Sequence, residues 1–266
     1  MLVSHRLTIR GSPAMTEEST LLRLQLEPGI EWVAPNEQEA RWQYNEIFYQ
    51  GCYDGVDLPD HAVVVDVGAN TGLFSLFVKS RCPTASVIAI EPMPEALQAL
   101  RLNVARHGLT NVAIHECAVG ASREQAIEFT YYPAIPGNST RYPEDKELQK
   151  EVLKRTVPAE DVEAEHIGYT VLVSVEATSS LLPVGPRIDL VKIDVEGSEL
   201  EVLQGINEND WPRIDQLTLE VQDLRGRLRA VRDLLHGRGY QTRVRPSPLI
   251  PPDIRTFVVD ASRGWV

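Results

Sequence analysis

Residues 63–72 read VVVDVGANTG, and this stretch decides the fold class of the chain. An apolar run over residues 62–67, broken only by Asp66, ends at Gly68, as a buried strand of a parallel sheet does. Helical periodicity follows over residues 73–79. A strand, a glycine turn and a helix in this order form the ligand-binding end of a Rossmann-like sheet. The stretch therefore predicts a binding turn at the start of such a sheet.

Strands and helices alternate along the rest of the chain. Further strands are predicted over residues 86–90, 112–115, 125–132, 171–175, 188–193 and 217–221, and helices over residues 36–50, 94–107, 198–205 and 224–237. Strands that alternate with helices are joined by crossover connections, which give a mostly parallel, doubly wound sheet. The last two strands, over 241–244 and 256–259, are expected to form an antiparallel hairpin at its edge. The fold class is α/β.

The chain divides into two parts of unequal size. Residues 1–58 comprise a polar tail, followed by a helix that is expected to cap the rest of the molecule. Residues 59–266 are expected to form one Rossmann-like domain, since the chain is long enough for one α/β core with additions. The pattern is lost over residues 133–170, and insertions of this length are usually functional lids or disordered. We predict a lid there, whose degree of order the sequence leaves open.

Composition excludes several classes of protein. The formal charge of −12, from 38 acidic and 26 basic residues, argues against nucleic acid, because affinity for phosphates comes largely from lysine and arginine. Cys52, Cys82 and Cys117 are odd in number and lack metal-type spacing, so neither a disulfide framework nor a zinc site is indicated. No run approaches the ~18 apolar residues of a membrane helix, and the first residues lack the apolar core of a signal peptide. We expect a cytoplasmic protein that binds neither membranes nor nucleic acid.

Three details of the turn favour S-adenosylmethionine over a dinucleotide as its ligand. The spacing from Gly68 to Gly72 is not the G-x-G-x-x-G that lets a pyrophosphate approach the helix. Asp66 would repel a pyrophosphate but suits a ligand that carries an ammonium and a sulfonium. Glu91 ends the second strand about 20 residues further on, where an acid holds ribose hydroxyls. An NAD-dependent oxidoreductase is therefore the less favoured alternative.

The strand ends supply the predicted cofactor residues. Glu91 is either a ribose ligand or a solvated strand end, and Cys117 and Ala118 either border the adenine or simply end the third strand. The full predicted set of cofactor-binding residues is Asp66, Gly68, Asn70, Gly72, Leu73, Glu91, Cys117, Ala118 and Asp194.

Four segments resemble a known family, the FkbM-type methyltransferases. They are VDVGANTGLFSL at the first turn, the EP turn at Glu91, LVKIDVEGSELEVLQG over residues 190–205 and TLEVQ over residues 218–222. The resemblance covers roughly residues 60 to 245, and KIDVEG is its most specific element. NEIFYQGCYDGVDLP, which begins at Asn45, further resembles members that work in polyketide and nonribosomal-peptide pathways.

The resemblance implies a class I methyltransferase fold and methyl transfer from S-adenosylmethionine to a hydroxyl. Acceptors in such a family are often a sugar, a macrolide or an acyl group bound to a carrier protein. A protein that binds the cofactor without catalysing transfer is the remaining alternative.

Methyl transfer is an in-line displacement, so an enzyme must align an oxygen nucleophile and remove its proton. Asp194 ends a buried strand next to the predicted cofactor, and Glu196 follows at the mouth of the same turn. Adjacent carboxylates raise one another's pKa, which gives one of them base character near neutral pH. We predict Asp194 and Glu196 as catalytic residues. The alternative for Glu196 is an acid that complements the dipole of the helix starting at Ser198.

A divalent metal such as Mg²⁺ is left open by the sequence. Asp194 and Glu220, with Gln222, offer the oxygen ligands that this metal prefers. However, no Asp-Asn pair follows that strand to complete the arrangement of catechol-type methyltransferases, and Asp223 is only a partial substitute.

Substrate contacts are predicted from the lid and from the strand over residues 217–221. Asn138, Ser139 and Thr140 resemble the family's small polar turn near the substrate. His166 lies in the lid and is either a substrate contact or an ordinary polar residue, and Glu220 is expected to point into the cleft because a buried acid needs a partner.

Arginines are concentrated near the end of the chain. Arg225, Arg229 and Arg232 follow the spacing of one helix face and form a local positive patch on an acidic protein. The patch is either a solvated helix face or a docking surface for an acidic acyl-carrier protein that delivers a bound substrate. The other expected substrate is a free small molecule, and a homodimer is left open.

Overall fold

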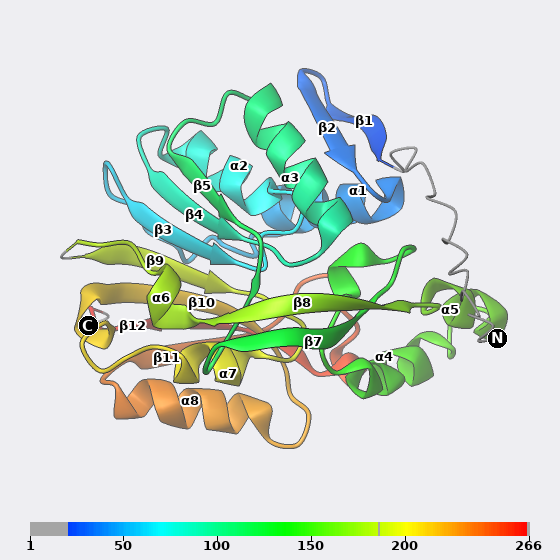
Figure 1. Ribbon diagram of the computed structural model, residues 1–266. Coiled ribbons are helices and arrows are strands. Elements are labelled where there is room, and N and C mark those ends of the chain that lie inside the picture. The colour runs from blue at the N-terminus through cyan, green and yellow to red at the C-terminus, as the bar shows by residue number, and fades with distance from the viewer. Residues whose placement is uncertain (1–20, 186, 265–266) are drawn as a thin grey trace, which may run out of the picture.

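The central sheet follows the strand order β11-β12-β10-β9-β3-β4-β5. The computed structural model describes residues 21–185 and 187–264 (Figure 1). The parallel strands are β3 (Val63–Val67), β4 (Ser86–Ile90), β5 (Val112–His115), β9 (Ile188–Ile193) and β10 (Ile214–Gln222). The strands β12 (Thr256–Ser262) and β11 (Gln241–Pro246) run antiparallel at one edge. The predicted Rossmann-like α/β fold, with an antiparallel hairpin near its C-terminus, is confirmed.

Helices cover both faces of this sheet because successive side chains of a strand point to opposite faces. Val64 of β3 packs in one cluster with Phe74 and Phe77 of α2 (Leu73–Arg81). Val65 packs in another with residues of α7 (Glu199–Gln204) and α8 (Arg227–Gly237). The helix α3 (Pro94–Arg106) packs on Ala89 of β4 through Leu97 and Leu100. In the described part of the chain, no helix is both long and apolar enough to cross a membrane.

Two strands expected in the central sheet belong to a second, smaller sheet. It contains β6 (Ala118–Gly120), β8 (Tyr169–Ala177) and β7 (Glu124–Tyr131) in the order β6-β8-β7, and α6 (Thr178–Leu181) follows it. Its buried residues Phe129 and Val173 pack with Met93 and Ala96 at the start of α3. The strands predicted at residues 125–132 and 171–175 are thus present, but they do not belong to the central sheet. A hydrophobic pattern predicts a strand without showing which sheet the strand joins.

The insertion predicted over residues 133–170 is ordered and largely helical. It contains the short helices η1 (Pro136–Asn138) and η2 (Pro143–Asp145), then α4 (Lys146–Leu153) and α5 (Ala159–Glu165), and its last residues begin β8. Val152 of α4 and Val162 of α5 are buried, and α5 packs against α4 at one side of the molecule (Figure 1). Two more short helices, η3 (Trp211–Arg213) and η4 (Pro252–Ile254), precede β10 and β12.

The N-terminal part contains a hairpin as well as the predicted helix. The helix α1 (Glu37–Tyr49) is capped by Asn36, whose side chain accepts from the N–H of Glu39. Before it, β1 (Leu22–Glu27) and β2 (Ile30–Ala34) pair antiparallel, where a polar tail was expected. Fully buried Trp32 packs with Tyr44 of α1 and anchors the hairpin. Residues 1–20 of the predicted tail lie outside the described residues.

Candidate active site

A cavity of about 490 Å³ opens at the carboxyl ends of β3, β4 and β9. This is the edge of an open α/β sheet where ligands bind. The turn after β3, the end of β4 and the start of β6 line one part of it. The helix α1, the insertion, the turn after β9, the end of β10 and the loop before β12 line the other. Eight segments, many of them far apart in the sequence, therefore meet around this cavity.

The turn after β3 has an unusual backbone. Gly68, Asn70 and Gly72 have φ angles of 79°, 45° and 94°. A Cβ at Gly68 would lie 1.8 Å from the backbone oxygen of Asp194, so the turn after β9 leaves room only for glycine. The N–H groups of Gly68 and Ala69 both donate to the carbonyl of Ile90, at 3.0 Å. Gly68, Asn70 and Leu73 line the cavity, whereas Gly72 sits behind them and begins α2.

Glu91 faces this turn from the end of β4. Its carboxylate accepts from the N–H of Asn70 at 2.8 Å and from the N–H of Met93 at 2.9 Å. Burial raises the pKa of Glu91 to about 7, and the two backbone donors oppose that rise. Each carboxylate oxygen keeps a second lone pair for a ligand hydroxyl. Cys117 and Ala118, predicted to border the adenine, also line the cavity.

Asp66 was predicted to bind the cofactor. It does not line the cavity but lies buried beneath it. It is fully buried, and it pairs with Lys192 of β9 at 3.3 Å and accepts from the Ser75 hydroxyl at 3.3 Å. Burial raises the pKa of Asp66, and the Lys192 charge counters this effect. The Lys192 ammonium also donates to the Gly68 carbonyl at 2.6 Å and lies 3.6 Å from a carboxylate oxygen of Asp194. Lys192 thus joins the two strand ends, a role that sequence reasoning missed although it is the one lysine in the apolar strand 188–193.

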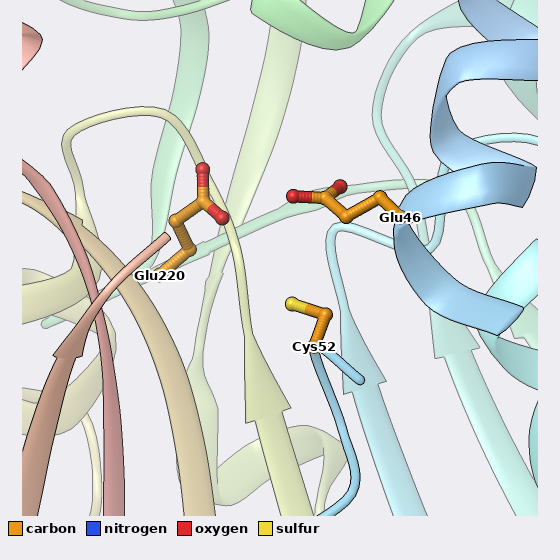
Figure 2. A group of neighbouring side chains, drawn as sticks. All are labelled: Glu46, Cys52 and Glu220. Atoms are coloured by element: carbon orange, nitrogen blue, oxygen red, sulfur yellow. The ribbon is translucent and has the colours of Figure 1, made fainter. Parts of the chain in front are cut away.

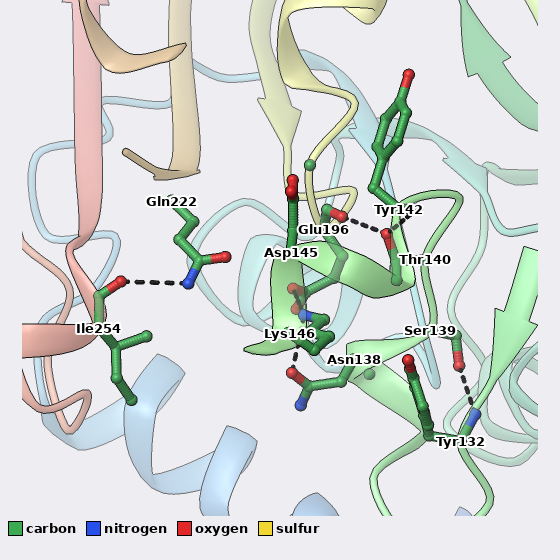
Figure 3. Close-up of polar contacts among 12 residues, drawn as sticks. Tyr132, Asn138, Ser139, Thr140, Tyr142, Asp145, Lys146, Glu196, Gln222 and Ile254 are labelled. Carbon is green, nitrogen blue, oxygen red and sulfur yellow. Dashed lines mark hydrogen bonds and ion pairs between the residues drawn. The ribbon is translucent and has the colours of Figure 1, made fainter. Parts of the chain in front are cut away.

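The two predicted catalytic acids line the cavity together. Asp194 is partly exposed, and Glu196 has a φ of 55°, which is uncommon for a residue with a side chain. Lys146 of the insertion is buried, and its ammonium donates to Glu196 Oε2 at 2.5 Å and to Asn138 Oδ1 at 2.9 Å (Figure 3). Burial raises the pKa of Glu196, with the charge of Lys146 opposing the rise. Sequence reasoning did not find Lys146, because nothing in a charged stretch marks one lysine as buried.

The predicted substrate residues separate into two groups. Asn138, Ser139 and Glu220 line the cavity, whereas Thr140 and His166 do not. Thr140 is buried and donates its hydroxyl to the backbone oxygen of Glu196 at 2.6 Å (Figure 3). His166 ends α5, and its Nδ1 lies 2.8 Å from the carbonyl of Val162. Thr140 therefore holds the turn of Glu196, and His166 belongs to the packing of the insertion.

Glu46, Cys52 and Glu220 point toward one another (Figure 2). Their ligand atoms lie within 4.8 Å of one another, and Ser247 donates to Glu220 at 2.9 Å. Burial, aided by the charge of Asp194, raises the pKa of Glu46 to about 8, and burial raises the pKa of Glu220 well above its ordinary value. Asp194 is not part of this group, but its charge adds to the rise in the pKa of Glu220. Gln222, the third suggested ligand, donates its amide to the Ile254 carbonyl.

Most of the predicted arginine patch is engaged with other side chains. Arg225 precedes α8 rather than lying on it, and it pairs with Asp145 of the insertion at 3.1 Å. Arg229 pairs with Asp233 at 3.5 Å, and the Arg232 guanidinium donates to the Thr242 hydroxyl at 3.4 Å. The predicted common helix face is therefore not formed by these three residues.

Comparison with known proteins gives concordant matches. A family model described as the methyltransferase FkbM domain matches residues 66–242. Methyltransferase 1 of Beauveria bassiana is 34% identical over 85% of this chain and 91% of its own length. The 31-O-demethyl-FK506 methyltransferase FkbM of Streptomyces tacrolimicus is 37% identical over 85% of this chain and 91% of its own length. The crystal structure of a methyltransferase FkbM from Methylobacillus flagellatus superposes with a TM-score of 0.54 at 18% identity, over 82% of this chain and 47% of that one.

Proposed function

The chain belongs to the FkbM methyltransferase family, and we propose that it is an S-adenosylmethionine-dependent O-methyltransferase. The acceptor in this proposal is a hydroxyl of a small molecule or of a natural-product intermediate bound to a carrier protein. The observation that carries the proposal is the excess of carboxyl groups in the cavity at the glycine turn. Eight carboxyl groups but only two lysines, Lys146 and Lys192, line the cavity, and both lysines pair with carboxylates. The eight acids are Glu39, Glu46, Glu91, Glu165, Asp194, Glu196, Glu199 and Glu220.

The residues at the turn fit a ligand with a cationic amino acid end and a ribose. Among the described residues, Asn70 Oδ1 is buried without a hydrogen-bond partner, although Asn70 lines the cavity. Such an acceptor suits an ammonium group. In this proposal Glu91 holds the ribose hydroxyls, and Cys117 and Ala118 border the adenine. We call these residues, with Gly68 and Leu73, the cofactor half of the cavity. When bound, the cofactor supplies an activated methyl group on its sulfonium.

The opposite residues form the acceptor half, which comprises Glu39, Glu46, Asn138, Lys146, Glu196 and Glu220. Asp194 lies between the two halves. In the proposed reaction Glu196 accepts the proton of the acceptor hydroxyl, and Asp194 orients that hydroxyl. A base must be ionised to accept a proton, and the ammonium of Lys146 favours the ionised form of Glu196 by opposing the rise in its pKa on burial. In this proposal Lys146 therefore assists proton transfer to Glu196 near neutral pH.

The lining also indicates which acceptors the cavity admits. Among the described residues, no arginine lines it, and its two lysines are already paired, so an acceptor with an anionic group near its hydroxyl lacks a partner. Apolar side chains of Trp42, Leu249 and Ile250 also line it, and Trp42 and Leu249 are exposed. These features support an uncharged, amphipathic acceptor, including an acyl group on a carrier arm. The relative named for 31-O-demethyl-FK506 supports transfer to oxygen. Three free cysteines support a cytoplasmic location.

The test is transfer of labelled methyl from S-adenosylmethionine to a panel of hydroxyl compounds, free and loaded on acyl-carrier protein, with and without chelator. We expect label in an alkali-stable ether. Calorimetric binding of the cofactor with no labelled product from any member of the panel would favour the non-catalytic alternative. Loss of activity with chelator would bring a metal into the mechanism.

A further inference from the structure

The turn that faces the cofactor half is held in a conformation that costs energy. Gly68, Asn70 and Gly72 all have positive φ, and for Asn70 the left-handed region is unfavourable. Such a backbone persists only where the surrounding structure fixes it. Glu91 fixes one side of the turn through the N–H of Asn70. A second anchor is therefore expected on the other side, at Thr71.

Thr71 is hydrogen-bonded on both its side chain and its backbone to residues outside the turn. Its hydroxyl accepts from the indole N–H of Trp32 at 3.0 Å, and its carbonyl accepts from the amide of Asn103 at 2.9 Å. Asn103 also bonds both backbone groups of Val33, each at 2.8 Å. The side chains of Trp32 and Asn103 are fully buried, and Thr71 is 3% exposed. The hairpin strand β2, the helix α3 and the turn thus form one hydrogen-bonded unit.

We infer that Trp32, Thr71 and Asn103 are positioning residues for the cofactor. The N-terminal hairpin lies before residues 66–242, the part of the chain that the family model matches, yet it sets the geometry of the turn. None of the three side chains lines the cavity, so they act through the backbone of Asn70 and its neighbours. The inference rests on the proposed function, because it takes S-adenosylmethionine as the ligand of this turn.

The experiment compares variants that remove the same hydrogen bond from either of its partners. Thr71→Val and Trp32→Phe both remove the bond between the indole and the hydroxyl, and each is expected to weaken calorimetric binding of S-adenosylmethionine about three- to tenfold. The double variant should bind about as weakly as either single variant, since both changes remove the same bond. Thr71→Ser retains the hydroxyl and should bind nearly as well as the unchanged protein.

Trp211→Phe is the matched control. Trp211 is also buried, and its indole N–H donates to the Ile206 carbonyl at 3.1 Å in a cluster on α7 and α8. This variant should lose a similar amount of thermal stability but keep its cofactor affinity. Equal affinity in Thr71→Val and the unchanged protein, or an equal loss in Trp211→Phe, would overturn the inference. If the unchanged protein itself does not bind the cofactor, the proposed function fails, and the inference with it. If Trp32→Phe does not fold, the pair Thr71→Val and Thr71→Ser decides.

Discussion

The cofactor half and the acceptor half of the cavity are built in different ways. The cofactor half comes from the turn after β3, the end of β4 and the start of β6, and backbone N–H groups of its turn are held by Glu91 and by the carbonyl of Ile90. The acceptor half joins segments that are remote in sequence, as in the bond from the N–H of Gly137 to Glu39 and the ion pair of Lys146 with Glu196. Substitutions in α1 or in the insertion can therefore alter the acceptor half without moving the residues of the cofactor half. The difference suggests that affinity for the cofactor and turnover of the acceptor can be separated by mutation.

The largest expected effect is on turnover in the acceptor half. Replacement of the proposed base in Glu196→Gln should lower kcat about 10²- to 10⁴-fold, with cofactor affinity retained within about threefold. Rates from labelled methyl transfer and affinities from calorimetry measure the two quantities. The exposed acid Glu208 pairs with Arg238, neither residue lines the cavity, and Glu208→Gln is the control. Unchanged kcat in Glu196→Gln would remove this residue from the mechanism.

The corresponding change in the cofactor half is Gly68→Ala. The new Cβ would overlap the Asp194 carbonyl, so we expect cofactor affinity to fall on the order of 100-fold and stability to fall by more than about 2 kcal/mol. Gly226 has the same φ of 79° with no atom within 4 Å of the added Cβ. Gly226→Ala should therefore cost only about 1 kcal/mol and leave binding intact. Similar behaviour of both variants would show that the close approach to Asp194 is unimportant.

A smaller effect on the acceptor half is expected from Lys146→Met. Loss of the ammonium raises the pKa of Glu196 further, because burial is then unopposed, so the base ionises only at higher pH. We expect turnover at pH 7 to fall about tenfold and the rising limb of the pH-rate profile to move upward. Lys150 lies on the same helix and pairs with Glu147 and Glu163, outside the cavity lining. A profile of Lys146→Met that matches the profile of Lys150→Met would contradict this role.

The smallest expected effect concerns stability rather than rate. The pKa of Glu46 is raised to about 8, so the unfolded chain loses this proton at lower pH than the folded protein does. Stability without ligand should therefore fall as the pH rises from about 4.5 to about 8. Glu46→Gln cannot ionise and should melt a few degrees higher at pH 8, with a smaller gain at pH 5, since about 1 kcal/mol corresponds to roughly 2–4 °C. Glu37→Gln, an exposed change on the same helix, is the control for thermal scans. An equal gain at both pH values would argue against titration of Glu46.

Sequence reasoning located most of the cofactor half because its signals are local. A glycine turn after an apolar strand, and an acid that ends the next strand, define their own neighbours once the sheet is parallel. Sequence reasoning predicted Asp66 as a cofactor residue, whereas the structure buries it away from the cavity lining. The hydrophobic pattern shows that Asp66 is in a strand but does not show which buried group pairs with it. The partner of Asp66 is Lys192, 126 positions further along the chain and on the neighbouring strand β9.

The acceptor half was predicted only in part. Glu196 was predicted as catalytic and Asn138 and Glu220 as substrate residues, and all three line the cavity, whereas Glu39, Glu46 and Lys146, which also line it, were not predicted. Helix periodicity indicates which face of α1 or α4 is apolar, but Glu46 and Lys146 are polar groups buried against that expectation. Their burial depends on the docking of each helix over the end of the sheet.

The sequence by itself determined the α/β class, the binding turn and the family, since each follows from short stretches whose periodicity and turn residues are set by local backbone sterics. Only the tertiary structure showed that two strands belong to a second sheet, that the insertion forms helices, and which groups the charged side chains pair with. These depend on contacts between distant segments, such as Trp32 with Thr71 and Lys146 with Glu196. The physical reason is that burial and charge pairing are properties of the packed chain, in which the surroundings of a side chain come from residues far from it in sequence.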